Sequence, residues 1–299
     1  MRPILTLGLG VALLAVACGR IDASAQAGVS VVAGFYPLAE AAQRIGGNCV
    51  TVTNLTPPGV EPHDLELTPH DVESLAAAGV VLLMGGGFQP AVERGAAMSE
   101  GTVIDVLDIA NATLPVPPSE SGDALSVDPH LWLDPGRWAD VVRTLGADLA
   151  SELPTSCHAT ANADAYAHEL DALDRAFSEG LATCERRTIV TTHSAFGYLA
   201  DAYGLTQEAI AGILPEAEPS AQRLSELQDL VQREGITTIF TEDLVPPDVA
   251  ETLAAEVGVK VATLHTLEGL TDEQLAAGAD YRSMMRENLA TLEEALGCG

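Results

Sequence analysis

The chain has 299 residues, of which 47% are hydrophobic and 19% charged, so it is long enough for about two globular domains and too apolar to be disordered. Acidic residues number 43 against 14 basic ones, which gives a formal net charge of −29. This balance excludes nucleic acid and anionic lipid as main partners, because both require a basic surface, whereas an acidic surface concentrates cations.

The N-terminal segment predicts export. An apolar run over residues 4–17 is too short to span a bilayer but has the length of a signal-peptide core. The run ends in LLAVAC, which resembles a bacterial lipobox with Cys18 as the acylated residue. We expect a signal peptide over 1–18 and a flexible tether over 19–28; cleavage after Ala25 is the alternative and would release a soluble protein. Cys18 would be the only point of membrane contact.

From residue 29 onwards, short apolar runs alternate with longer amphipathic stretches, the pattern of strands alternating with helices. Thr68 is the expected N-cap of one helix, with Pro69 in its first position. A Pro/Ser/Asp-rich loop is expected over 111–129. The predicted strands are 29–33, 50–55, 80–84, 103–106, 188–192, 206–210, 237–241 and 259–264. The predicted helices are 37–45, 68–78, 135–153, 159–181, 195–203, 220–234, 247–257 and 281–296.

This alternation predicts an α/β fold with two lobes, each a mainly parallel four-stranded sheet flanked by helices. We place the lobes at 29–157 and 184–299, joined by a long rigid helix over 158–183. The Gly- and Pro-free part of that helix, about 20 residues, would extend about 30 Å. In such folds, ligands bind at the carboxyl ends of the strands.

Three of the seven histidines stand at such positions. His63 lies in a proline-stiffened loop after a strand, His130 lies between two Asp-Pro pairs, and His193 directly follows the strand 188–192. Neutral imidazole is a good zinc ligand, and three imidazoles leave a fourth tetrahedral position. We therefore predict a zinc site made of these three residues, with an affinity that falls as the pH drops through about 6.5.

The other histidines are weaker candidates. His158 and His168 fall on the linking helices and are expected to face solvent, and His70 is interpreted as an exposed residue at the start of a helix. His265 remains a minor candidate because it lies close to the expected position of a fourth ligand.

Several motifs resemble those of the zinc- and manganese-binding solute-binding proteins of ABC uptake systems, in the same order along the chain. The motifs are GFYPL (34–38), GVEPHD (59–64), DPHLWLDP (128–135), THSAFGY (192–198) and DYRSMMRENL (280–289). The resemblance implies two α/β lobes joined by a rigid helix, with the metal held between them by His63, His130 and His193. It also implies an ABC membrane permease as the partner, and we expect a monomer.

The family places a carboxylate or a water in the loop after the last strand of the second lobe. Glu268 occupies that place here, so we predict it as the fourth ligand. His265 and water are the alternatives, and Glu242 and Asp243 at the preceding strand end come next.

The third ligand position bears on the identity of the metal. Manganese-binding relatives tend to carry glutamate where this chain has His193, and nitrogen ligands favour zinc. The resemblance therefore implies Zn(II) as the transported ligand, with manganese as the alternative.

Two other function classes remain open: a zinc hydrolase and a surface adhesin. Three histidines with an open position are also the ligands of catalytic zinc. However, the chain contains neither a His-Glu-x-x-His motif nor a Gly-x-Ser-x-Gly elbow, so we do not expect an enzyme.

Four cysteines follow Cys18, and export would place them in an oxidising compartment. They allow three pairings, among which the sequence does not choose. The pairing that keeps each disulfide within one half of the chain is Cys49–Cys157 and Cys184–Cys298.

Overall fold

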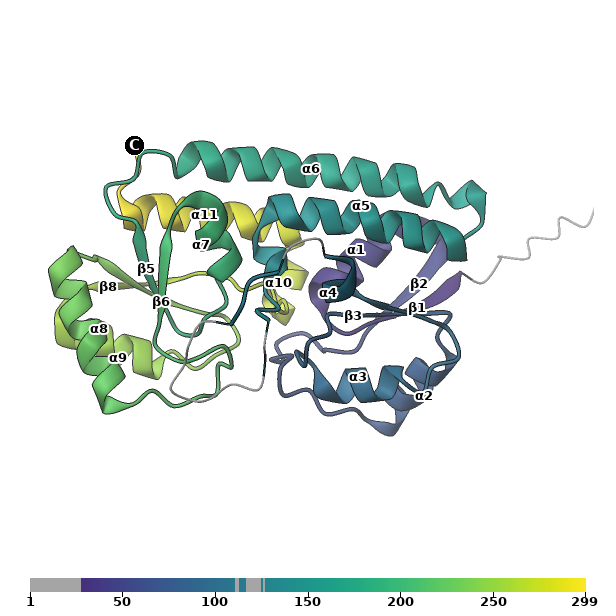
Figure 1. The fold of residues 1–299 in the computed structure, drawn as a ribbon, viewed down its shortest axis with the longest axis horizontal. Coiled ribbons are helices and arrows are strands. Elements are labelled where there is room, and N and C mark those ends of the chain that lie inside the picture. The colour runs from purple at the N-terminus through teal and green to yellow at the C-terminus, as the bar shows by residue number, and fades with distance from the viewer. Residues whose placement is uncertain (1–27, 111–112, 117–124, 126) are drawn as a thin grey trace, which may run out of the picture.

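The computed structural model describes residues 28–110, 113–116, 125 and 127–299. The predicted signal peptide and all but the last residue of the predicted tether lie outside these residues. Within them, the chain forms two four-stranded parallel sheets, with strand orders β2-β1-β3-β4 and β6-β5-β7-β8 (Figure 1). The strands are β1 (Val29–Ala33), β2 (Val50–Asn54), β3 (Val80–Leu83), β4 (Thr102–Asp105), β5 (Thr188–Thr191), β6 (Thr206–Ala209), β7 (Thr238–Thr241) and β8 (Lys260–Thr263). The predicted fold class is confirmed.

Burial explains why the sequence of β3 is a continuous apolar run. All four residues of β3 are buried, because this strand lies between β1 and β4 and both faces of the sheet are covered by helices.

The α-helices are α1 (Tyr36–Gly46), α2 (Pro69–Ala77), α3 (Pro90–Ala96), α4 (Val106–Ile109), α5 (Pro135–Glu152), α6 (Ala159–Gly180), α7 (Gly197–Tyr203), α8 (Ala221–Glu234), α9 (Asp248–Val257), α10 (Asp272–Ala276) and α11 (Tyr281–Leu296).

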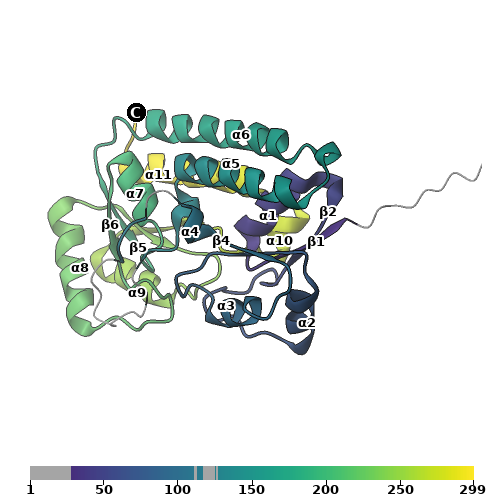
Figure 2. The same ribbon diagram turned by 45° about the vertical axis from the view of Figure 1, so that its right-hand side comes forward.

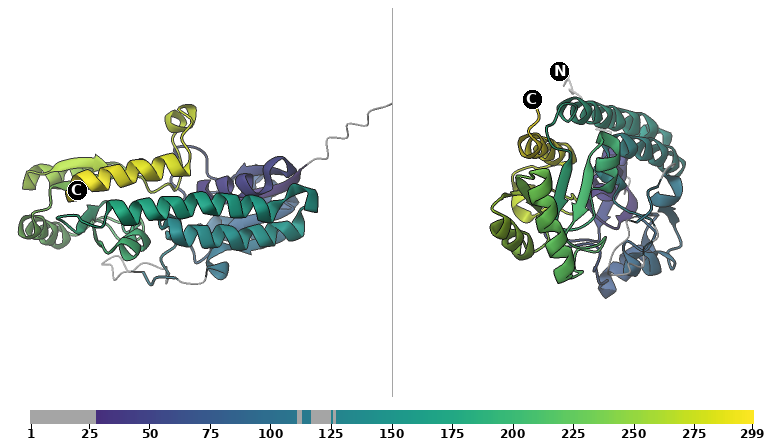
Figure 3. Two further views of the ribbon diagram at one scale, coloured as in Figure 1. Left: turned by 90° about the horizontal axis from the view of Figure 1, so that it is seen from above. Right: turned by 60° about the vertical axis from the view of Figure 1, so that its left-hand side comes forward.

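Helix α6 lies across both sheets and packs along α5, with further contacts to α1 and α11 (Figures 1 and 2). Seen from above, α11, α6 and α5 lie side by side as a layer of helices (Figure 3). With 22 residues, α6 extends about 33 Å. Leu170 and Phe177 on its inner face are fully buried, so the helix is held along its length by apolar contacts.

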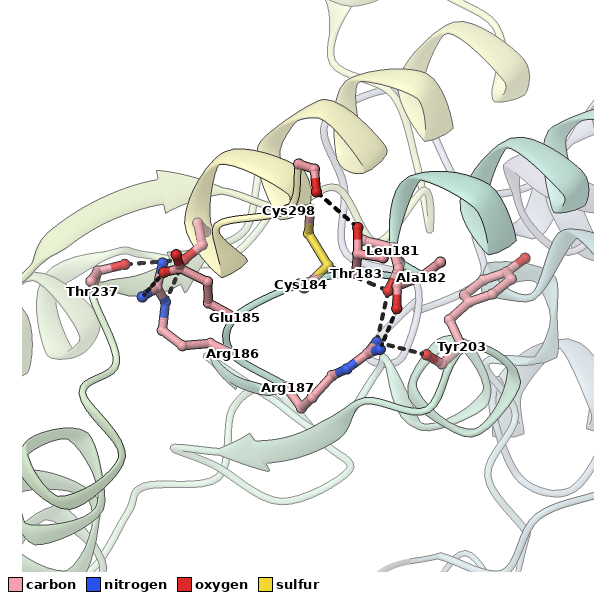
Figure 4. Close-up of a disulfide and its surroundings, with 12 residues drawn as sticks. Leu181, Ala182, Thr183, Cys184, Glu185, Arg186, Arg187, Tyr203, Thr237 and Cys298 are labelled. Carbon is pink, nitrogen blue, oxygen red and sulfur yellow. Dashed lines mark hydrogen bonds and ion pairs between the residues drawn. A yellow bond between two sulfur atoms is a disulfide. The ribbon is translucent and has the colours of Figure 1, made fainter.

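Both disulfides of the within-half pairing are present, Cys49–Cys157 and Cys184–Cys298. The second joins the segment after α6 to the end of the chain (Figure 4). Beside it, Arg187 donates to the carbonyl oxygens of Leu181 and Ala182, which follow the last residue of α6 (Figure 4). A guanidinium at this position satisfies carbonyls that the helix leaves unpaired.

Several boundaries and short helices differ from the prediction. Helix α7 begins at Gly197 rather than at residue 195, because the segment before it forms a turn. In this turn Thr191 Oγ1 donates to the carbonyl of His193. Helices α3, α4 and α10 were not predicted, since they are too short to show a helical period. The predicted cap of α2 is confirmed: Thr68 and Asp71 form a capping box, with Pro69 first in the helix.

Among the described helices, none has the length and apolar character needed to cross a membrane.

Candidate metal centre

The structure brings the four predicted ligands together. His63 lies in the loop after β2, His193 is the second residue after the end of β5, and Glu268 lies in the segment after β8. His130 stands immediately before the short 3₁₀ turn Leu131–Leu133 that leads into α5. These four residues form the one group of three or more potential metal ligands found in the described part of the chain, with one ligand atom from each lying within 4.8 Å of the others.

The distances within this group match those between ligands of a single ion. Oε1 of Glu268 lies 3.1 Å from Nε2 of His130, 3.3 Å from Nε2 of His63 and 3.5 Å from Nε2 of His193. Two atoms bonded at about 2.0–2.1 Å to one tetrahedral zinc ion are about 3.3 Å apart. All four side chains are at most 1% exposed. The geometry therefore fits one enclosed zinc ion.

Asp128 orients His130. Its Oδ1 lies 2.8 Å from Nδ1 of the His130 ring and also accepts the backbone N–H of His130 at 2.9 Å. A carboxylate at Nδ1 holds the proton on that nitrogen and leaves the lone pair of Nε2 directed at the centre of the group. Tyr198 in turn donates its hydroxyl to the carbonyl of Asp128 at 2.8 Å.

Glu242 lies behind His193 in a similar place, as an ion-pair partner of the ring. It follows β7, and its Oε2 lies 2.6 Å from Nδ1 of His193 while its Oε1 accepts the backbone N–H of His193 at 3.1 Å. The hydroxyl of Thr192 also donates to this carboxylate. Nε2 of His193 is thereby turned towards the centre, so Glu242 lies behind a ligand and is not part of the four-residue group.

Gln89 braces the loop that carries His63. Its side-chain amide donates to the carbonyl of Pro62 at 3.3 Å and to Thr56 Oγ1 at 3.1 Å. The Phe88 ring meets the His63 ring edge-on, with centroids 4.6 Å apart. Neither ring nitrogen of His63 has a hydrogen bond of good geometry within the described residues. Buried nitrogens without partners are costly, and a bound metal ion would satisfy one of them.

Hydrogen bonds of the adjacent residues hold Glu268 in place. Thr266 Oγ1 donates to its Oε2 at 3.1 Å, and Trp132 Nε1 donates to the carbonyl of Thr266 at 2.8 Å. Leu267, which stands between Thr266 and Glu268, adopts a left-handed backbone conformation with φ of 54°, which is unusual for a residue with a side chain. This turn directs the carboxylate inwards from the second sheet.

Burial and charge shift the pKa values of the group in opposite directions. Burial lowers the pKa of His63. Burial also disfavours charge on His130 and His193, but the carboxylates that face them outweigh it: Asp128 and Glu268 raise the pKa of His130, and Glu242 and Glu268 raise that of His193 well above its usual value.

The carboxylate of Glu268 shows the reverse effect. Burial opposes its ionisation, yet the three imidazoles around it hold its pKa well below the usual range. The metal-free centre is thus a buried, mutually compensating set of charges, which is typical of functional sites.

Glu61 is a further carboxylate beside the group. Its Oε1 lies 4.0 Å from Nε2 of His63, and burial together with the nearby Glu268 raises its pKa to about 8. Glu61 belongs to the GVEPHD motif, but no role was predicted for it. The sequence feature that could have indicated a role is its position two residues before His63, in a loop stiffened by proline.

The remaining candidates lie elsewhere. His265 contacts Asp243 through Nδ1, its Nε2 lies 3.4 Å from Glu287, and neither His265 nor Asp243 belongs to the four-residue group. His70, His158 and His168 are exposed, as predicted. The orienting roles of Asp128 and Glu242 were not predicted; Glu242 was considered only as an alternative fourth ligand.

The model of the ZnuA family, described as a zinc-uptake complex component A, periplasmic, matches residues 31–295. The chain is 35% identical over 288 residues to the zinc-binding protein AdcA of Streptococcus pyogenes, covering 90% of this chain and 56% of that protein. It is 31% identical over 306 residues to the high-affinity zinc uptake system protein ZnuA of Bacillus subtilis, covering 95% and 94% respectively.

The fold is similar to that of the Zn(II)-bound ZnuA-like domain of Streptococcus pneumoniae AdcA, with a TM-score of 0.75 and 33% identity. That likeness covers 90% of this chain and 99% of the domain. The chain spans little more than half of the full-length streptococcal relatives it matches, 56% in the case of the Streptococcus pyogenes protein.

Proposed function

The chain belongs to the ZnuA family of zinc-uptake components, and on that premise we propose that it captures Zn(II) outside the cytoplasmic membrane and delivers it to an ABC transporter permease. The zinc ion is the cargo, and its ligands are Nε2 of His63, His130 and His193 and a carboxylate oxygen of Glu268. The observation that carries the proposal is the convergence of these four buried atoms at the spacing of a tetrahedral zinc ion.

The ligand set favours zinc over manganese. Three imidazole nitrogens and one carboxylate suit zinc, whereas manganese prefers a site made mostly of oxygen. The same set speaks against a hydrolase, because a fourth protein ligand occupies the position that a catalytic zinc leaves for water.

The two halves of the chain contribute equally to the site. His63 and His130 come from the proposed first lobe (29–157), and His193 and Glu268 come from the proposed second lobe (184–299), with the helix at 158–183 joining them. A bound ion would hold the two lobes together, and the permease would distinguish loaded from empty protein by that shape. We propose that the chain acts as a monomer, exported by its N-terminal segment and lipid-anchored at Cys18.

Zinc titration tests the proposal. Chelator-stripped protein should take up one zinc ion per chain, measured by competition with a chromophoric chelator and by elemental analysis. His193→Ala should weaken zinc binding by more than about 100-fold. Loss of a residue that only supports a ligand costs up to about 100-fold, and loss of the ligand itself should cost more. The control is His168→Ala, which removes an exposed imidazole from α6. Equal affinity of His193→Ala and the parent would contradict the assignment, and tighter binding of manganese than of zinc would contradict the choice of cargo.

A further inference from the structure

Glu61 stands apart from the other polar residues at the centre. Its side chain is 19% exposed, whereas the four proposed ligands are at most 1% exposed. It lies in the same loop as His63, and its two carboxylate oxygens face different surroundings. Oε2 accepts the backbone N–H of His63 at 2.9 Å.

The other oxygen, Oε1, is directed inwards. It is buried, has no hydrogen-bond partner among the described residues, and lies 4.0 Å from Nε2 of His63, the atom proposed to bind zinc. A buried carboxylate oxygen without a partner is costly unless a cation or a donor reaches it. A metal ion bonded to Nε2 of His63 at about 2.0–2.1 Å can pass within reach of this oxygen.

The loop of Glu61 also lies at the seam between the two halves of the chain. The backbone N–H of Gly59 donates to the carbonyl of Leu270 at 3.0 Å, and Leu270 lies two residues beyond Glu268. Val60 next to Glu61 is 38% exposed. Glu61 therefore places a partly exposed carboxyl group beside the buried ligands, in the loop where the two halves of the chain meet.

We propose that Glu61 is a transit ligand, which binds zinc together with His63 during its arrival and its release. On arrival, Glu61 releases its proton to solvent and its Oε1 replaces a water on the hydrated ion. Glu268 then bonds to the ion, and Glu61 dissociates from the ion and takes up a proton again. One carboxylate replaces another, so the charge of the ligand set does not change during the transfer. Zinc supports such an exchange because it can expand to five ligands. This inference rests on the proposed zinc function of the same site.

A transit ligand lowers the barrier in both directions, so its loss slows binding and release together. We expect Glu61→Gln to slow zinc association and chelator-driven release by about tenfold each, which corresponds to about 1.4 kcal/mol in the barrier, while Kd stays within about threefold of the parent. Glutamine keeps an oxygen that can accept the His63 N–H, so the loop retains its shape. Stopped-flow fluorescence can follow both steps, because the ring centroid of Trp132 lies 5.2 Å from that of His130.

The matched control is Glu66→Gln, which makes the same substitution at an exposed residue of the same loop. The slowing in Glu61→Gln should persist at high salt, whereas any general effect of charge on association is screened. Thermal unfolding of the metal-free variant should match that of the parent, which shows that the fold is intact.

Rates for Glu61→Gln equal to those of Glu66→Gln would overturn the transit role. Faster release with unchanged association would also overturn it, because Glu61 would then hold the bound ion rather than pass it on. Failure of the parent itself to bind zinc would refute the proposed function instead, so the two results are distinguishable.

Discussion

Glu242→Gln is the sharpest test of how the centre works, because it changes one charge and hardly any volume. Oε2 of Glu242 lies 2.6 Å from Nδ1 of His193, on the side of the ring away from the proposed ion. The carboxylate makes the imidazole a stronger ligand and fixes which nitrogen faces the metal. Glutamine can still accept the His193 backbone N–H but carries no charge.

Loss of a carboxylate behind a metal-bound histidine costs about 10–100-fold in affinity, or about 1.4–2.8 kcal/mol. The loss should depend on pH. In the parent, Glu242 raises the pKa of His193, so zinc must displace a proton from this ring over a wider pH range. In the variant that pKa is lower, and less proton displacement is needed. The Kd of the variant divided by the Kd of the parent should therefore be largest at alkaline pH and should decrease as the pH falls.

Competition titrations with a chromophoric zinc chelator at a series of pH values would measure this ratio. Calorimetry in two buffers of different ionisation enthalpy would count the protons released, and the variant should release fewer at neutral pH. Glu179→Gln, on the exposed face of α6, serves as the charge-matched control. An affinity within twofold of the parent at every pH would show that the carboxylate does not act through His193.

Two further predictions concern pH and folding. The affinity of the parent for zinc should fall on acidification, and the fall should begin above about pH 6.5, because the pKa values of His130 and His193 are raised and these rings keep their protons to higher pH. Chelator competition at a series of pH values measures this fall. An affinity that stays constant from pH 8 to pH 6 would contradict it. Trp132→Phe should destabilise the metal-free protein by about 1–3 kcal/mol in urea unfolding, since it leaves the buried carbonyl of Thr266 unpaired. Trp138→Phe is the control, because Nε1 of this equally buried ring has no partner in the described chain and no hydrogen bond is lost.

The strands and the three histidines could be predicted because their signals are local. A buried parallel strand is a short apolar run bounded by turn residues, and His193 is the second residue after the end of one. His63 and His130 lie in segments stiffened by proline, and the order of the strands brings their ends to a common region. Glu268 required the family resemblance, since an acidic residue in a loop is by itself an ordinary surface feature.

The supporting carboxylates could not be predicted, because their roles depend on packing between distant segments. Glu242 reaches His193 only because β7 pairs directly beside β5 in the sheet, which brings the two strand ends together. Asp128 reaches His130 through a local turn that the adjacent proline favours, yet its choice of Nδ1 is a matter of side-chain rotamer. The left-handed turn at Leu267 has no sequence signal, since glycine or asparagine is usual in that conformation.

The charges around the centre suit the proposed capture of a divalent cation in a buried place. Glu268, Asp128 and Glu242 bring three carboxyl groups, and those that face His130 and His193 raise the pKa values of these two rings, so protons compete with a metal ion for them. Zinc carries two positive charges and needs both imidazoles neutral. Binding of the proposed zinc ion therefore displaces protons from these rings, and the charge of the ion replaces theirs. An exchange of protons for the ion limits the change in buried charge, and so it avoids the large cost of leaving unpaired carboxylates in the interior.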